Sequence, residues 1–398
     1  MIKKLPPPVN KAKNNIVKIL SPYFLIHKYG SFMPEPEKEE KAVVFFGANF
    51  KDLPGADWDK FIDITNKSLD YVRRECVGHK LYYKPHPAET DEFKLVNLNG
   101  FEITKDTSIA EFYLWKNGRN IKYTFSTCSG ANISAYYMGF NSYVFRDLLK
   151  SAIDEETDKG YTKYFKNMPA SFFINDLSQK LTENKKTPPE DLFLEKEFSD
   201  LFREDRGRIW FTIGDPNYLV NVLILASLAK KINLSKKINL VIMKHHRWNV
   251  MNLDDFKSYF DEVYFFPRIF YSLRPQKIIK AVKTAYALKK LKVSPDDIIV
   301  GASYTSFTEN CLLSYNKRNY KVAILPQATI DFCCSSLVFN DNNFRTRRSV
   351  FWWSNFLEPI LGLKQTIFFE DNRRIGNFTR FKKPLNDIYD KVYALQAY

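Results

Sequence analysis

Continuous apolar runs that end in Gly, Pro or a small polar residue most constrain what this chain can fold into. The first, KAVVFFGANF from Lys41 to Phe50, is apolar from Ala42 to Phe46 and closes at Gly47. A strand that is apolar on every side chain is buried on both faces, which is typical of a parallel sheet covered by helices. The run therefore predicts a layered α/β structure.

Strand and helix patterns alternate along two long parts of the chain. In the first part, strands are expected at 41–47, 79–87, 100–106, 121–126 and 141–145, with helices at 58–76, 108–116 and 130–138. In the second part, strands are expected at 208–214, 238–248, 260–266, 296–306 and 320–326, with helices at 215–231, 275–291 and 307–318. Such alternation predicts two doubly wound domains, each with a parallel sheet.

The length of 398 residues also favours more than one core. Residues 1–41 are rich in Lys and Pro and are interpreted as an arm and linker, with a short docking helix within Asn14 to Gly30. The other predicted parts are a first α/β domain at 42–150, a bridging region at 151–204, a second α/β domain at 205–330, and an aromatic and basic C-terminal segment at 331–398.

Charge and cysteine content indicate the kind of partner and the cellular compartment to expect for this protein. The net charge of +15 suggests an anionic partner. Nucleic acid is not favoured, because no zinc finger, RNP-like motif or basic heptad region is present. No run reaches the roughly 20 apolar residues of a membrane span. The five Cys show no CxxC pair and no metal spacing, which indicates free thiols in a reducing cytoplasm.

The C-terminal segment combines basic and aromatic residues. Two interpretations stand: an aromatic helix docked on the core, or an interfacial segment that holds the protein peripherally on the inner face of an anionic membrane. The residues concerned are Arg345, Arg347, Arg348, Phe351, Trp352, Trp353, Phe356, Leu357, Ile360 and Leu361.

The stretch KLYYKPHPAETDEF, from Lys80 to Phe93, ends an aromatic strand with a stiff turn. Its two prolines fix φ and remove backbone donors, so neither a helix nor a ladder passes through them. Lys84 and His86 are therefore placed at the carboxyl end of a strand, which is where ligands bind in an open parallel sheet. An exposed His on an ordinary turn is the alternative.

A cluster of hydroxyl residues follows the fourth strand. In FSTCSGANISAYYMG, from Phe125 to Gly139, a strand runs into Ser126, Thr127 and Ser129 before a helix begins. Hydroxyls and free N–H groups at such a point can bind an anion. Ordinary helix capping by one Ser or Thr is the alternative.

YYKPHPAE, SIAEFYLW and FSTCSGANISAYYMG together resemble the donor half of bacterial CMP-sugar transferases, over about residues 42–150. That group includes bacterial sialyltransferases and Kdo transferases of capsule and lipopolysaccharide assembly. The resemblance implies that His86, Ser126, Thr127 and Ser129 hold the CMP phosphate. It also implies that Glu111 lies near the ribose, and Lys84 is included in the predicted donor site.

The order of the halves departs from the sialyltransferases, whose donor domain comes second. Here the donor-like half comes first, as in the retaining β-Kdo transferases that the chain is similar to. The resemblance implies a GT-B-like fold, with two Rossmann-type domains that face a cleft in exchanged order. It also implies a CMP-β-Kdo donor and a lipid-linked bacterial glycan as acceptor, while the oligomeric state stays open.

Candidates for bond chemistry lie in the second α/β domain. Asp215 follows a strand and precedes Pro216, where it is either a catalytic carboxylate or a helix cap. Successive strand residues point to opposite faces, so at most one of His245 and His246 is expected to face the cleft, and His246 is preferred. Arg268 and Ser303, at later strand ends, are the predicted substrate-binding residues.

Two mechanisms remain open for Asp215. A retaining enzyme that works by double displacement needs a carboxylate nucleophile, and the β-Kdo transferases resembled here use an Asp in this way. An inverting sialyltransferase needs a base instead. A non-enzymatic glycan- or membrane-binding scaffold is the third alternative. No metal is expected, since Asp254–Asp255 and Asp296–Asp297 fit helix caps better than a DxD motif.

Overall fold

The computed structural model describes residues 17–35, 41–48, 55–86, 89, 95–184, 192–203, 206–244, 246–269, 272–302, 307–326, 352–363, 366–370, 377–381 and 389–396. The chain forms two compact units. Unit 1 combines Met1–Leu20 with Leu192–Ala397, and unit 2 spans Ser21–Asp191. The described strand Val17–Leu20 therefore belongs to the same unit as the second half of the sequence.

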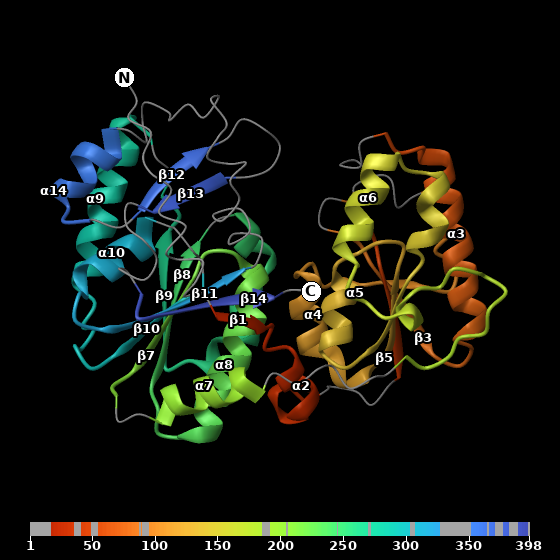
Figure 1. The fold of residues 1–398 in the computed structure, drawn as a ribbon, viewed down its shortest axis with the longest axis horizontal. Helices are drawn as coiled ribbons and strands as arrows, with labels where there is room; N and C mark the ends of the chain where they lie inside the picture. The colour runs from red at the N-terminus through yellow and green to blue at the C-terminus, as the bar shows by residue number, and fades with distance from the viewer. Residues whose placement is uncertain are drawn as a thin grey trace. The chain divides into compact units, whose positions relative to one another are not determined.

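Unit 2 is built on a five-stranded parallel sheet with the order β4-β3-β2-β5-β6 (Figure 1). Helices α4 and α5 lie on one side of this sheet and α3 on the other. The strands are β2 (Ala42–Phe46), β3 (Lys80–Lys84), β4 (Glu102–Ile103), β5 (Ile121–Ser126) and β6 (Asn141–Val144). The α-helices are α2 (Phe24–Lys28), α3 (Trp58–Glu75), α4 (Ala110–Asn117), α5 (Ala131–Tyr137) and α6 (Glu155–Tyr164). Short 3-10 helices are η1 (Gly30–Phe32), η3 (Gly118–Asn120), η4 (Arg146–Ser151) and η5 (Ala170–Phe172).

Aromatic rings on neighbouring strands stack across this sheet. The Phe45 ring lies 5.9 Å from Tyr83 on β3, and the Phe125 ring lies 5.2 Å from Tyr143 on β6. All four side chains are almost completely buried. Stacked rings add to the apolar burial and hold the strands in register.

Unit 1 is built on a seven-stranded parallel sheet with the order β1-β14-β11-β10-β7-β8-β9. The strands are β1 (Val17–Leu20), β7 (Ile209–Ile213), β8 (Ile238–Lys244), β9 (Glu262–Pro267), β10 (Ile298–Gly301), β11 (Tyr320–Pro326) and β14 (Lys391–Gln396). Its α-helices are α7 (Leu192–Arg203), α8 (Leu219–Ile232), α9 (Pro275–Lys289), α10 (Phe307–Tyr315) and α14 (Glu358–Ile360). A π-helical turn covers Trp353–Leu357, and β12 (Thr366–Glu370) pairs antiparallel with β13 (Asn377–Phe381). The 3-10 helices are η6 (Pro216–Tyr218), η7 (His246–Val250), η8 (Leu253–Asp255) and η9 (Lys257–Tyr259).

In each sheet, successive strands are added in two directions from an inner strand, β2 in unit 2 and β7 in unit 1. In unit 2 the chain runs from β2 to β3 and β4, then returns to add β5 and β6 on the other side of β2. In unit 1 it runs from β7 to β8 and β9, then returns to add β10 and β11. The strand order therefore reverses between β2 and β5 and between β7 and β10. Ligand sites of doubly wound folds lie at such switch points.

The prediction of an α/β protein with two parallel sheets is confirmed, and both sheets are Rossmann-like. The N-terminal segment differs from its prediction. Among its described residues, Val17–Leu20 forms a strand that pairs with β14, and the α-helix covers Phe24–Lys28. A strand of four residues is too short for its periodicity to separate a strand from a helix.

The described part of the C-terminal aromatic segment packs on unit 1. The Trp353 ring is fully buried, lies 5.6 Å from Phe307 on α10, and its Nε1 donates to the Ser272 carbonyl at 2.9 Å. Phe356 and Ile360 are exposed on the same turns. Arg345, Arg347, Arg348 and Phe351 lie outside the described residues.

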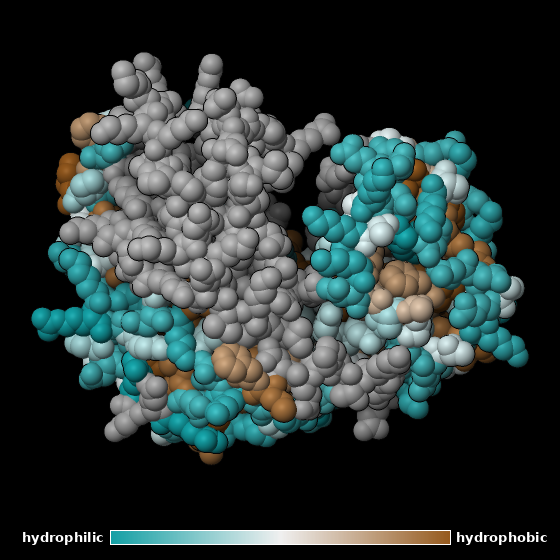
Figure 2. Space-filling model, in the orientation of Figure 1, coloured by the Kyte–Doolittle hydropathy of each residue, from teal (hydrophilic) through white to brown (hydrophobic). Residues whose placement is uncertain are grey.

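No helix within the described ranges is long and apolar enough to cross a membrane. Where unit 2 can be seen in Figure 2, its surface is largely hydrophilic. Its apolar side chains are used mainly in the core around the sheet.

A buried carboxylate ties two strands of unit 1 together at their amino ends. Asp297, which is 1% exposed and precedes β10, accepts from the Trp210 Nε1 at 2.8 Å and from the Arg208 backbone N–H at 2.7 Å. It also accepts from the Ser294 N–H at 2.9 Å and forms an ion pair with the Arg208 guanidinium at 3.0 Å. The two carboxylate oxygens of Asp297 thus accept from donors in and just before β7, and from a donor just before β10.

Asp297→Ala should destabilise unit 1 strongly. The change leaves the buried Trp210 N–H and two backbone N–H groups without their acceptor, and the loss should be about 3–5 kcal/mol. Chemical denaturation followed by Trp fluorescence measures it. Asp296→Ala is the matched control, because Asp296 is the exposed neighbour and uses only its backbone carbonyl, which accepts from Gly207. Equal stability of the two variants would contradict the role given to Asp297.

Candidate functional site

The turn after β3 is closed by a carboxylate. Glu89 Oε2 accepts from the His86 backbone N–H at 2.7 Å, and the Glu89 N–H donates to the His86 carbonyl at 2.8 Å. The other oxygen, Glu89 Oε1, accepts from the Tyr83 hydroxyl at 2.5 Å. The backbone of His86 is thereby fixed to the last buried ring of β3, and its side chain is partly exposed.

Gly47, at the end of β2, makes room for this arrangement. A Cβ at Gly47 would lie 2.2 Å from Glu89 Oε2 and 2.7 Å from the Tyr83 hydroxyl. Burial, reinforced by the nearby Glu89 charge, raises the pKa of Tyr83 well above its usual value. The phenol therefore remains a donor at any working pH. Sequence reasoning missed Glu89, although its position three residues after His86 is the spacing of a side chain that closes a turn.

Lys84 lies inside unit 2. It is 3% exposed, its Nζ donates to the Asp106 carbonyl at 2.7 Å, and the amine stands 4.9 Å from the centre of the Tyr113 ring. Burial lowers the pKa of Lys84 to about 8, against the opposing influence of Asp106 and Glu111. In this arrangement Lys84 anchors the segment after β4.

The hydroxyl cluster after β5 divides into buried and accessible members. Ser126 and Thr127 are at most 1% exposed, whereas Ser129 is partly exposed. Ser126 Oγ accepts from the Ser129 N–H at 2.8 Å, and Ser129 Oγ accepts from the Ala131 N–H at 3.3 Å. Two of the three hydroxyl oxygens thus satisfy local backbone donors, as helix caps do. Ser129 is the member that can also reach a ligand.

Glu111 connects to the same segment through α5. Its Oε1 accepts from Ser134 Oγ at 3.2 Å, so α4 and α5 are joined beside the hydroxyl cluster. Tyr164 lies over Gly130, where a Cβ would stand 2.2 Å from the Tyr164 hydroxyl. Tyr164 as a whole residue is 43% exposed, but desolvation of its hydroxyl, reinforced by Glu111 and Cys128, raises the pKa of Tyr164 to about 12. Tyr164, a further residue that sequence reasoning missed, is therefore a neutral hydroxyl at this site.

Strand register brings these pieces to one edge of the sheet. Phe46 on β2 pairs with Lys84 on one side and with Ser126 on the other. Two strand spacings separate β3 from β5, or about 10 Å. The His86 turn and the Ser129 turn therefore flank the end of β2, next to the switch point between β2 and β5.

Asp215 holds the corresponding position in unit 1. It follows β7 at the switch point between β7 and β10, and it caps η6 by accepting from the Asn217 N–H at 3.1 Å. Trp248 supports the preceding residue, since its Nε1 donates to the Gly214 carbonyl at 3.0 Å. Asp215 therefore caps η6. Its partly exposed carboxylate also lies at the switch point, which is where doubly wound folds bind ligands.

A second carboxylate, Glu309, was not expected from the sequence. It is 1% exposed in the first turn of α10 and accepts from the Tyr389 hydroxyl at 3.0 Å. A Cβ at Gly301, the last residue of β10, would lie 2.1 Å from Glu309 Oε1. Gly301 pairs with Thr212 on β7, so Glu309 lies near the same switch point as Asp215.

The remaining predicted residues of unit 1 are less well defined. His246 begins η7 directly after β8, and the placement of its side chain lies outside what the structure describes. Arg268 follows the edge strand β9, two strands away from β7, and its backbone N–H donates to the Lys244 carbonyl at 3.1 Å. Ser303 lies outside the described residues.

Within the described ranges, no group of three or more His, Cys, Asp or Glu side chains is arranged to hold a metal ion. Cys76, Cys128 and Cys311 are buried free thiols. Each unit therefore presents one switch point, with hydroxyls and an imidazole in unit 2 and carboxylates in unit 1.

Lys84→Met should change how stability depends on pH. The pKa of Lys84 is about 8 in the folded protein against a usual 10.5, so the unfolded chain binds more protons between these values. The free energy of unfolding of the wild type should therefore rise with pH across this window, relative to the variant, by on the order of 3 kcal/mol. Urea denaturation between pH 7 and pH 10.5 measures the difference.

The exposed Lys105 provides the control for that experiment. Lys105→Met should follow the wild-type pH profile. If the profiles of wild type and Lys84→Met ran parallel, Lys84 would not be the buried amine described here.

Comparisons with known proteins give only distant likenesses. No protein-family model and no curated protein matches the chain. Among solved structures, it is similar to an O-ureido-L-serine synthase at 10% identity, 76% of this chain, 82% of that chain and a TM-score of 0.21. It is also similar to a UDP-GlcNAc 2-epimerase from Neisseria meningitidis bound to UDP-GlcNAc, at 13% identity, 71% and 81% coverage and a TM-score of 0.18. A third similar structure is a variant of the wall teichoic acid polymerase TagF, at 11% identity. The match covers 77% of this chain and 74% of that chain, with a TM-score of 0.19. TM-scores this low assign no family and no activity.

Proposed function

We propose that the protein is a glycosyltransferase that transfers Kdo from CMP-β-Kdo to a bacterial surface glycan with retention of configuration. The observation that supports the proposal is where the candidate residues lie in the two sheets. His86 and Ser129 of the motifs that resemble the CMP-sugar transferases, and the candidate nucleophile Asp215, follow the carboxyl ends of inner strands of their sheets. Chemistry-bearing residues scattered at random would not gather beside both switch points.

In this proposal, unit 2 binds the CMP part of the donor. The His86 imidazole and the Ser129 hydroxyl donate to the phosphate, while Tyr164 provides a neutral donor nearby. Glu111, already held by Ser134, accepts from a ribose hydroxyl. The buried Lys84 acts at longer range, because its amine is engaged by Asp106 and contributes charge rather than a direct contact.

Unit 1 supplies the bond chemistry. The Asp215 carboxylate attacks the anomeric carbon of Kdo, the bond from that carbon to the phosphate oxygen breaks, and CMP leaves with the electron pair. The acceptor hydroxyl then attacks the same carbon and displaces Asp215. His246 takes the proton of that hydroxyl, which restores the carboxylate. Two inversions give net retention. In this proposal, Arg268 and Ser303 bind either the acceptor or the carboxylate group of Kdo.

A cytoplasmic protein associated with the inner membrane surface fits this reaction. The donor is a nucleotide sugar, and the net charge of +15 favours an anionic surface that carries a lipid-linked acceptor. The exposed Phe356 and Ile360 lie in the segment that would make this contact.

His86→Ala should weaken CMP binding about 10- to 100-fold, because a hydrogen bond to a charged phosphate contributes roughly 1.5–3 kcal/mol. Isothermal titration with CMP measures the loss, and Ser129→Ala should lose less. His79→Ala is the matched control, since His79 precedes the amino end of the same strand and its ring lies 5.8 Å from Tyr123. Unchanged CMP affinity in His86→Ala would place the phosphate elsewhere.

Asp215→Asn should fold normally and bind CMP normally, because Asn caps a helix about as well as Asp. Transfer should fall by at least about 1,000-fold, since an amide is a poor nucleophile. Intact-mass analysis of the wild type with CMP-Kdo alone should show a sugar adduct that is absent in the variant. Asp254→Asn, an exposed Asp of the same unit, is the control.

The outcome of that experiment also separates the rival mechanisms. Loss of activity with no adduct in either protein, and an inverted product, would make Asp215 a base of an inverting transferase. Full transfer by Asp215→Asn would leave Asp215 a helix cap. No turnover of any CMP-sugar by the wild type would favour the non-enzymatic scaffold.

A further inference from the structure

Unit 2 contains a cavity at the edge of its sheet opposite to the proposed donor site. The cavity has a volume of about 420 Å³ and lies where β2, β5 and β6 begin, at Lys41, Ile121 and Asn141. His86 and Ser129 follow the other ends of β3 and β5. A strand of five or six residues spans about 17–20 Å, so one small molecule cannot occupy both places.

Two glycines define the walls of this cavity. A Cβ at Gly118 would lie 2.6 Å from both Met33 Sδ and Phe140 Cζ. Gly139 has a φ of +92°, and a Cβ there would lie 2.4 Å from His27 Nδ1. The side chains of Met33, Phe140 and His27 therefore pack directly against the backbone of the two glycines. The cavity persists between tightly packed walls, which makes it a formed feature of the fold.

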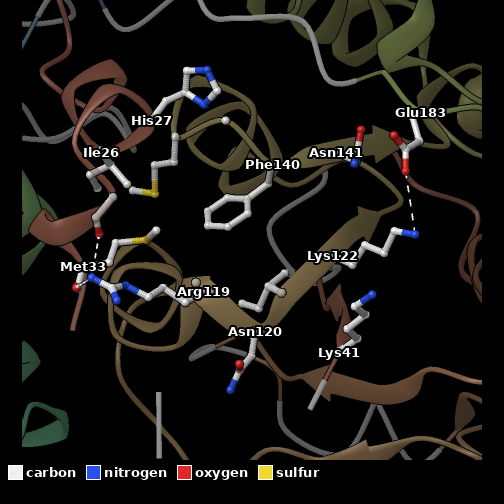
Figure 3. Close-up of a pocket in the computed structure, with 15 residues that line it drawn as sticks. Ile26, His27, Met33, Lys41, Arg119, Asn120, Lys122, Phe140, Asn141 and Glu183 are labelled. Atoms are coloured by element: carbon white, nitrogen blue, oxygen red, sulfur yellow. Dashed lines mark hydrogen bonds and ion pairs between the residues drawn. The ribbon is translucent and has the colours of Figure 1, made fainter. Parts of the chain in front are cut away.

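The two sides of the cavity differ in chemistry. Figure 3 shows Phe140, Met33 and Ile26 toward one side, whereas the amines of Lys41 and Lys122 extend on the other. Asn141 lies on the same side as these amines, next to Glu183. An apolar side opposite a cationic side suits a molecule that has an apolar body and an anionic group.

The charged side chains around the cavity differ in how strongly the rest of the protein binds them. Arg119 is engaged, because its guanidinium donates to the Gly30 and Met33 carbonyls at 3.0 and 2.9 Å and pairs with Glu35. Lys122 has a loose ion pair with Glu183 at 3.7 Å. Lys41 also lines the cavity and is exposed.

We propose that this cavity is a second small-molecule site, which binds an amphipathic anion. The ligand has an aromatic or aliphatic body against Phe140 and Met33, and an anionic group at the Lys41 and Lys122 amines. Its size class is that of a nucleoside monophosphate or an aromatic sulfonate. The site is separate from the proposed donor site and does not depend on the proposed function.

Methionine methyl NMR tests the site directly. Among the six Met of the chain, Met33 and Met138 line the cavity, whereas Met168, Met243 and Met251 do not. The full-length protein labelled at the methionine methyls is titrated with 1-anilinonaphthalene-8-sulfonate as the anionic probe. The Met33 and Met138 signals should shift together with one dissociation constant, while the other three stay in place. Absence of these shifts at millimolar probe would overturn the proposal.

Two controls test the charge requirement. N-phenyl-1-naphthylamine has the same aromatic body without the sulfonate, and it should bind at least about tenfold more weakly. Lys41→Glu combined with Lys122→Glu should weaken binding of the sulfonate by about tenfold or more while leaving binding of the amine unchanged. Lys163→Glu with Lys166→Glu, on the exposed surface of the same unit, should leave both unchanged. Equal binding of the two probes to the wild type would overturn the anionic selectivity and leave a purely apolar cavity.

Discussion

Parallel pairing of the strands in the two main sheets is the constraint on which the rest of the structure depends. Strands that are covered by helices have no solvated face, and β2 and β7 are buried along their whole length. Polar groups that must meet a ligand can therefore lie only at the two ends of the strands. The catalytic proposal uses the carboxyl ends, and the cavity of unit 2 uses the amino ends.

Within that constraint, the position of His86 depends on a chain of contacts that begins in the core. The Phe45 ring stacks on Tyr83, the Tyr83 hydroxyl donates to Glu89, and Glu89 accepts from the His86 N–H. Each link is short and at least partly buried, so the turn is held by the same packing that holds the sheet. A site built in this way loses little conformational entropy when a ligand binds.

The sequence pattern predicts the elements of this fold well, because alternating apolar runs and helical periodicity are local properties. The strands at 42–46, 80–84 and 209–213 follow directly from it. It does not predict that Val17–Leu20 pairs with β14, since that partner is remote in the chain. Nor does it separate Ser129, which reaches solvent, from Ser126 and Thr127, which do not. Glu89 and Glu309 were missed for the same reason, because their roles arise from tertiary contacts with Tyr83, Gly47, Tyr389 and Gly301.

The pairing of β1 with β14 has a consequence for the order in which the protein can be assembled during synthesis. Val17 lies beside Tyr393, and the whole of unit 2 is encoded between β1 and the other strands of unit 1. Unit 2 can fold as soon as Asp191 has left the ribosome, whereas β1 must wait for almost all of the remaining chain. An exposed VKIL strand during that interval is a candidate binding segment for a chaperone. Once β1 is in place, it covers the edge of β14 that would otherwise be open to pairing with another chain.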